Sequence, residues 1–222
     1  MKALQAFFQK TTSQIGALVI VLIILGAIVW NPLRVLSLQA QAGQRIDAYI
    51  QTHAKAVSRF LACQMPLLTD LPADEGLLRA IALLERARAY RPFRAHTAYL
   101  LGQTYCLGDD PFRAIEALNA FTQARPESPK GRMQAAYAHL TLAFSEDEPL
   151  REEDRSFHRE QSAQLLSASG YGFDYFLDQG QRAFKGEAYS TAWLFYRTAT
   201  LFAPLPEDAA EQLAVLSDAF GE

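Results

Sequence analysis

An internal repeat with a 34-residue spacing constrains the fold of this chain more than any other feature of its sequence. Ala80 and Ala114 lie 34 residues apart, and the Arg-Pro pairs that end at Pro92 and Pro126 keep the same spacing. A further copy lies 78 residues beyond the second, and the recurring positions are Gly102, Ala114 and Pro126 in one copy and Gly180, Ala192 and Pro204 in the other. A fixed period of this length is typical of a helical array, in which each hairpin buries its apolar face on the next.

The residue types at the recurring positions fit helical hairpins. A small residue such as Gly102 or Ala114 lets the two helices of one hairpin approach closely, because larger side chains would force them apart. A proline after the second helix cannot continue that helix, and it therefore ends each unit. The sequence predicts an all-α fold built from stacked hairpins.

Over about residues 61–206 the chain resembles the tetratricopeptide repeat family. In the segment 95–126 the family's positions are held by Leu101, Gly102, Tyr105, Ala114, Leu118 and Pro126. In the segment 173–204 they are held by Gly180, Gly186, Tyr189, Ala192, Tyr196, Ala199 and Pro204. The segment 77–92 matches only the second helix of a unit, and Ala98 stands where the family has a tryptophan. The resemblance implies an α-solenoid of about four hairpins.

An apolar run near the N-terminus predicts a transmembrane helix over residues 14–32. The run from Ile15 to Trp30 contains no charged side chain, and the uncharged stretch around it extends over 23 residues. A bilayer core needs about 20 helical residues. Pro32 is expected to break or bend the helix. A cleaved signal peptide is the competing interpretation, since residues 40–42 read Ala-Gln-Ala, although they lie about ten residues beyond the run.

The basic residues beside this run predict its orientation. Lys2, Lys10 and the α-amine precede it, whereas Arg34 and Arg45 follow it. Because basic groups favour the cytoplasmic side, the N-terminus is expected in the cytoplasm and residues 34–222 outside. The predicted localisation is single-pass in a membrane, with the repeat domain extracytoplasmic.

The remaining divisions of the chain follow from periodicity and charge. Residues 1–13 form a short tail, and residues 33–60 form an amphipathic linker helix. The apolar stripe that continues this helix is made of Leu38, Ala42, Ile46, Tyr49, Ile50, Val57, Phe60 and Leu61. The third repeat carries an insertion near 145–160 with seven acidic and three basic residues, which is a solvated charged segment or, alternatively, an acidic docking patch. Residues 207–222 form a capping helix.

The two cysteines do not form a metal-binding motif. Cys63 and Cys106 are 43 residues apart, with no CxxC, so they cannot supply a zinc cage on their own. Two unbonded thiols and a single disulfide are both open. The register implied by the family places the two residues near opposite ends of adjacent first helices, which argues against a bond.

No pattern of catalytic residues is present. The sequence lacks GxSxG, GxxxxGK[ST] and GxGxxG. Asp154 and His158 stand four residues apart with Glu153 nearby, and a salt-bridged surface explains them better than a metal site. The formal net charge of −3 disfavours a nucleic-acid binder. We expect no enzyme activity, no cofactor, no metal and no nucleic acid.

The family resemblance implies a partner-binding groove lined by the first helix of each hairpin. The positions with groove-facing spacing are His96, Tyr99, Gln103, Lys130, Met133, Tyr137, Leu177, Gln181, Phe184 and Lys185. Their mixture of aromatic and polar side chains suits an extended peptide or a helix from a protein partner. Tyr99 and Gln103 take the places of the lysine and asparagine in the family's carboxylate clamp, so that mode is not expected.

These features together predict a membrane-anchored scaffold or adaptor that mediates protein–protein interaction or complex assembly. The alternative is a structural accessory subunit of a larger membrane protein complex, held mainly through neighbouring transmembrane subunits and its own transmembrane helix. A third interpretation is an array that regulates a neighbouring envelope-building enzyme.

Overall fold

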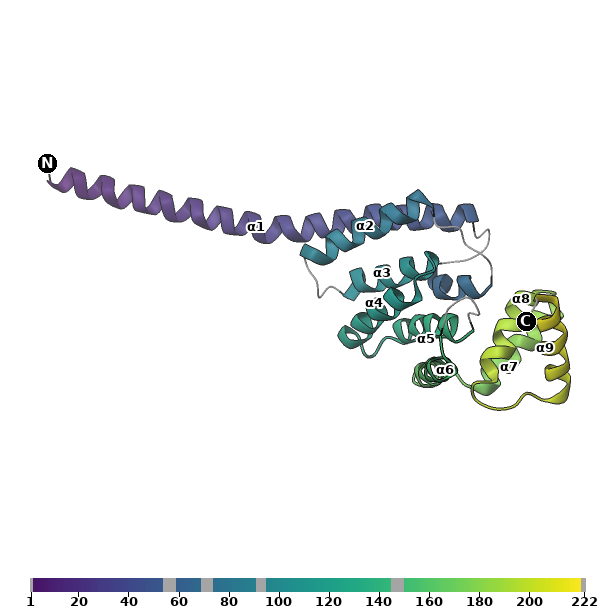
Figure 1. Cartoon of the computed structure of the whole chain (residues 1–222). Helices are drawn as coiled ribbons and strands as arrows, with labels where there is room; N and C mark the ends of the chain where they lie inside the picture. The colour runs from purple at the N-terminus through teal and green to yellow at the C-terminus, as the bar shows by residue number, and fades with distance from the viewer. Residues whose placement is uncertain (1, 54–58, 69–73, 91–94, 145–149, 221–222) are drawn as a thin grey trace.

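The structure is a computed structural model of the 222-residue chain, and its described elements are all helical (Figure 1). It describes residues 2–53, 59–68, 74–90, 95–144 and 150–220; the side chains of residues 2–24, 27, 28, 59–61 and 220 are outside this description. The elements are α1 Lys2–His53, the 3₁₀ helix η1 Arg59–Leu67, α2 Glu75–Tyr90, α3 Ala95–Leu107, α4 Pro111–Ala124, α5 Pro129–Phe144, α6 Glu152–Ser167, α7 Phe173–Lys185, α8 Tyr189–Ala199 and α9 Glu207–Phe220.

The helices pair into successive hairpins, which confirms the predicted all-α helical repeat. Pairs α3/α4, α5/α6 and α7/α8 each pack closely, and α4 also packs on α5. The last helix, α9, covers α8, where the Tyr196 hydroxyl donates to Gln212 Oε1 over 2.5 Å. This arrangement resembles that of tetratricopeptide repeats, with one helix of each pair facing the inside of the array and the other facing outward (Figure 1).

The recurring glycines lie where helices touch. A Cβ added to Gly102 would overlap the Leu118 side chain, and a Cβ on Gly180 would lie 2.5 Å from Cδ1 of Tyr196. Both contacts join residues 16 positions apart, so the same close approach recurs 78 residues later along the chain. The periodicity in the sequence thus reflects a repeated steric requirement between the two helices of a hairpin.

The second half of α1 supplies the first helix of the first hairpin. It runs antiparallel to α2, since Arg34 stacks 4.6 Å over the Tyr90 ring at the far end of α2. Gln39 Nε2 donates to Thr97 Oγ1 on α3 over 2.6 Å. The buried face of this stretch includes Val35, Leu38, Ala42, Ile46, Tyr49 and Ile50. The segment 77–92 therefore resembles only half a unit because its partner helix comes from α1; Pro92 lies outside the described residues.

The prediction of a transmembrane helix over residues 14–32 is contradicted. Within the residues that the structure describes, no helix combines the length and the apolar character needed to cross a membrane. Much of the predicted segment falls on residues whose side chains are not described. The helix also does not end at Pro32 but continues to His53, and beyond Pro32 it has one buried face and one exposed polar face. This part belongs to the helical array because its apolar side chains are buried on α2 and α3.

The predicted single-pass membrane localisation, with its orientation and extracytoplasmic repeat domain, is contradicted by the same finding. It depended on the apolar run alone, and a hydropathy pattern does not report which neighbouring helices cover a helix face. The long helix α1 extends from the body of the array toward the N-terminus (Figure 1).

The predicted insertion contributes the start of α6. Residues 145–149 are outside the description, and α6 begins at Glu152. Acidic side chains occupy its first turn, where they interact favourably with the helix dipole. Arg151 lies 3.0 Å from Asp154, so part of the acidic charge in this segment is paired locally.

Candidate functional site

The inner surface, as we define it, is the side of α3 and α5 on which the 3₁₀ helix η1 lies. Helices α3 and α5 are the first helices of two successive hairpins, and η1 packs against both of them. In a repeat array such a surface is concave and is where an extended segment or a helix binds. Here the chain places one of its own segments there.

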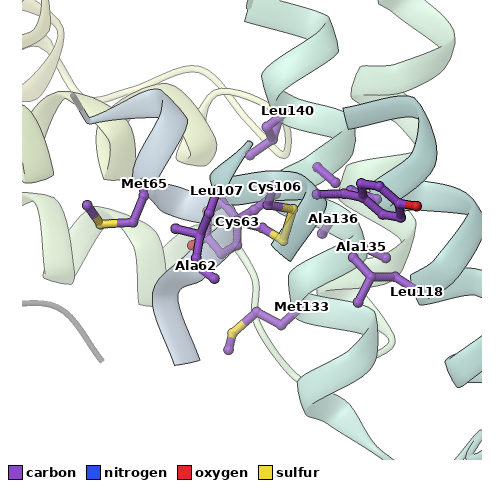
Figure 2. Packing of buried hydrophobic residues seen from close by; sticks show 14 of the residues in the cluster. Ala62, Cys63, Met65, Cys106, Leu107, Leu118, Met133, Ala135, Ala136 and Leu140 are labelled. Atoms are coloured by element: carbon purple, nitrogen blue, oxygen red, sulfur yellow. A yellow bond between two sulfur atoms is a disulfide. The ribbon is translucent and has the colours of Figure 1, made fainter. Parts of the chain in front are cut away.

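A disulfide joins η1 to α3. Cys63 and Cys106 are bonded, with 4.9 Å between their Cα atoms. Figure 2 shows the bond between the ribbons of η1 and α3, with side chains of α5 close by. The argument from register against this bond is wrong because Cys63 does not lie on the first helix of a regular hairpin. It lies on η1, which crosses beside α3 at the level of Cys106.

Polar contacts fix η1 on α5 as well. The backbone N–H of Cys63 donates to Gln134 Oε1 over 3.0 Å, and both groups are buried. The Gln64 carboxamide is hydrogen-bonded to the phenol of Tyr137. A buried N–H without an acceptor would be costly, so Gln134 satisfies the backbone of η1 at the point where the segment is most deeply enclosed.

Apolar contacts complete the seat of η1. Ala62 and Met65 are 1% and 3% exposed, and they lie beside buried side chains from both supporting helices. Those labelled in Figure 2 are Leu107 from α3 and Met133, Ala135, Ala136 and Leu140 from α5. The described side chains of η1 carry no charge, which matches a buried, uncharged surface.

Three of the predicted groove residues form the floor beneath η1. Gln103, Met133 and Tyr137 are buried, at 2%, 8% and 2% exposure. Burial is the main reason that the pKa of Tyr137 is raised, and Tyr171 and Tyr175 raise it further. Those two tyrosines come from the start of α7 and its preceding turn, so this end of the C-terminal hairpin faces α5.

The other predicted positions on α3 and α5 are more open. His96 and Lys130 are exposed, and Tyr99 is half-buried. Tyr99 accepts a hydrogen bond from Gln103 Nε2 over 3.2 Å, and its ring lies 4.9 Å from that of Phe121 on α4. Burial raises the pKa of Tyr99. The structure thus brings Tyr99 and Gln103 together, with Tyr99 also packed against the second helix of its hairpin.

The predicted positions on α7 lie on a separate hairpin. Leu177, Gln181 and Phe184 are half-buried, and Lys185 is exposed. The Phe184 ring lies 5.7 Å from that of Tyr189, so Phe184 packs within its own hairpin.

Sequence reasoning missed the residues that hold η1, namely Gln64, Met65 and Gln134. The available signal was weak: Cys63 and Cys106 are the only cysteines in the chain, and a pairing between them would have brought residues near 63 onto α3. Gln134 sits next to the predicted Met133, but nothing in a helical pattern marks it as the acceptor for a segment 71 residues away.

A second hollow, of about 490 Å³, lies between α6 and α8. Its lining includes Phe144 at the end of α5, Ser156 and Arg159 from α6, and Arg197 and Thr200 from the C-terminal hairpin. The Arg197 guanidinium stacks 4.3 Å over the Phe144 ring and 5.1 Å from the Trp193 ring, and Arg159 pairs with Glu152. The stacked arginine links the C-terminal hairpin to α5.

Among the described residues, no group of three or more His, Cys, Asp or Glu side chains could hold a metal ion. His158 does not extend outward with Asp154 as a surface pair; its Nδ1 lies 2.8 Å from Nδ1 of His139 on α5. The chemistry that the inner surface offers is recognition of a neutral polypeptide segment through amide and apolar contacts.

Comparison with known proteins adds little. No protein-family model matches the chain, and no curated protein matches its sequence. Among solved structures, one that is similar is titled "Crystal structure of MamA", with 18% sequence identity and a TM-score of 0.36. The match covers 66% of this chain and 80% of that one. The description of the fold as a helical repeat therefore depends on the hairpins and repeated glycine contacts of this chain itself.

Proposed function

We propose that this chain is a protein-interaction scaffold that holds a segment of a partner protein along its inner surface and so promotes assembly of a complex. The observation that carries the proposal is the seat of η1. Helices α3 and α5 accommodate a short polypeptide segment there, through a carboxamide on its backbone and close apolar contacts. These are the interactions by which a groove recognises an extended peptide.

The half-open positions extend this surface beyond η1. Leu177, Gln181 and Phe184 on α7 would contact the partner, with Lys185, His96 and Lys130 at the rim. Tyr99, Gln103, Met133 and Tyr137 would act as the floor that shapes the groove. The alternative, an accessory subunit held mainly through a transmembrane helix, loses its basis with that helix.

Site-specific photocrosslinking in cells tests the proposal. A photoreactive residue at Gln181, on the proposed surface, should give a discrete crosslinked product that contains another protein. The matched control is the same residue at Phe112, which is 51% exposed on α4, the outward-facing helix of its hairpin. Equal crosslinking from both positions, or none from Gln181, would contradict the proposal.

A further inference from the structure

The segment that fills the inner surface belongs to the chain itself, and it is attached there covalently. Residues 62–65 are buried against α3 and α5 at 7% exposure or less. The bond from Cys63 to Cys106 closes a loop of 43 residues. Any partner segment that needs the surface under Met65 must first displace η1.

We propose that η1 is a built-in competitor for the inner surface, and that breaking the Cys63–Cys106 bond allows a neutral partner segment of similar chemistry to take its place. The inference rests on the proposed function, because it describes how that same surface is controlled. It names the class of occupant from the contacts that η1 makes, and it makes the oxidation state of two cysteines the determinant of access.

The chemistry of the occupant follows from the seat. Gln134 Oε1 requires a backbone N–H that points into the surface. The space against Ala135 and Ala136 suits a small residue, and the site of Met65 suits an unbranched apolar side chain. The described side chains here are uncharged, and a charged residue buried at this point would be penalised by desolvation.

The bond-breaking step requires a dithiol reductant. One thiolate of the reductant attacks one sulfur of the disulfide, forming a mixed disulfide and releasing the other cysteine as a thiolate that takes up a proton. The second thiol of the reductant then displaces the first cysteine, which is also protonated. Two electrons and two protons pass to Cys63 and Cys106, and the reductant becomes a disulfide. Both cysteines are buried, at 0% and 3% exposure, so attack requires η1 to lift and reduction in the folded state should be slow.

Reduction alone does not empty the surface. Because η1 is joined to the array through the backbone on both sides, its effective concentration at its own seat is of the order of millimolar. A free segment with the same contacts therefore competes weakly against it. Weakening η1 without touching α3 or α5 should shift this competition strongly toward the free segment.

A labelled peptide with the sequence RFLASQMPL, residues 59–67 with serine in place of Cys63, is the probe. The receptors are the oxidised wild-type chain, C63S/C106S, and C63S/C106S with Met65→Asp, which places a carboxylate at a buried site of η1. The matched control is C63S/C106S with Leu78→Asp, since Leu78 is 57% exposed on α2. Fluorescence anisotropy measures binding, and circular dichroism measures helix content.

We expect no binding to the oxidised wild type and binding at least about tenfold tighter to the Met65→Asp variant than to C63S/C106S or the Leu78→Asp control. Adding Gln134→Ala to the Met65→Asp variant should reduce the affinity again. Equal binding to the oxidised wild type would overturn the inference, as would absence of binding to a Met65→Asp variant with normal helix content.

Hydrogen exchange on the wild-type chain decides the matter if the Met65→Asp variant does not fold. Reduction by dithiothreitol should speed exchange in residues 59–68, while α4 and α8 stay protected. Unchanged exchange in residues 59–68 after complete reduction would overturn the inference. If the Gln181 crosslink forms but the peptide does not bind, only the role of η1 fails; if the crosslink is also absent, the proposed function fails with it.

Discussion

At the scale of single residues, small side chains and buried polar groups set the geometry of the array. Gly102 and Gly180 each lie against a large side chain of the facing helix. His139 is 5% exposed and lies beside His158 across the α5/α6 hairpin. A hydrogen bond between two Nδ1 atoms requires one ring to donate and the other to accept, so protonating both rings breaks it.

Gly102→Ala should destabilise the chain by about 1–3 kcal/mol, because the added Cβ overlaps Leu118 and the α3/α4 hairpin must open. Urea unfolding followed by circular dichroism measures the change. Gly26→Ala is the control, since a Cβ there meets nothing within 4 Å, and alanine is a better helix former than glycine. A Gly102→Ala variant as stable as the wild type would show that the glycine contact is not tight.

Stability should fall as the pH falls through the range in which His139 resists protonation. Burial, aided by the nearby His158, lowers the pKa of His139 to about 4, whereas an unfolded chain has a histidine pKa of about 6.5. Between these values the unfolded chain binds more protons, so the folded state loses stability as the pH drops. His158 also has a lowered pKa, mainly through burial, although the charge of Asp154 opposes this.

His139→Gln should reduce this pH dependence by about 2 kcal/mol between pH 7 and pH 5. The measurement is the difference in free energy of unfolding between the two pH values, compared between wild type and variant so that the contributions of carboxylates cancel. His53→Gln, on α1 and away from this pair, is the control. An unchanged pH dependence in the His139 variant would show that the ring is protonated in the folded state.

At the scale of elements, η1 changes the array from a plain solenoid into one with an occupied inner surface. It is short, and 3₁₀ helices of this kind have poor hydrogen-bond geometry. Its position therefore depends on contacts with α3 and α5 and on the disulfide to Cys106 rather than on its own helical stability.

Removing the bond with C63S/C106S should lower the free energy of unfolding by about 2–4 kcal/mol, since the bond closes a 43-residue loop in the unfolded chain. Helix content should be retained, because the hairpins do not depend on the bond. Denaturant unfolding of the variant and of the oxidised and reduced wild type measures the loss. If reduced wild type and C63S/C106S differ from each other, the serine substitutions rather than the missing bond account for part of the effect.

At the scale of the whole molecule, helices α7, α8 and α9 form a group beside α5 and α6 (Figure 1). Trp193 of α8 is 6% exposed, and its ring lies 6.3 Å from that of Phe144 at the end of α5. Arg197 stacks over the same phenylalanine. This junction positions α7 relative to the surface that carries η1.

Trp193→Ala should cost about 3–5 kcal/mol, because it removes a large buried side chain and the contact with Phe144. Hydrogen exchange should become faster in α7–α9, with α3 and α4 unaffected. Tyr189→Ala, on the same helix but 47% exposed, is the matched control. Equal acceleration throughout the chain would show that the C-terminal hairpin and the rest of the array unfold as one unit.

Local chemistry made part of the structure predictable. Gly102 and Gly180 could be placed at helix contacts because the steric demand recurs at a constant spacing in every hairpin. Tyr137 and Gln103 could be placed on first helices for the same reason. That these two are buried was not predictable, since the segment that covers them is far away in the sequence and has no repeat pattern.

The sequence by itself determined the all-α class, the hairpin repeat and the positions where helices approach closely, because these depend on side-chain size and on a helical period of 3.6 residues. Tertiary structure alone decided that α1 supplies the first helix of the array and that Cys63 reaches Cys106. It also decided that Gln134 accepts from the backbone of η1. Each of these joins segments 43 to 71 residues apart, and the free energy of such contacts depends on how the hairpins stack.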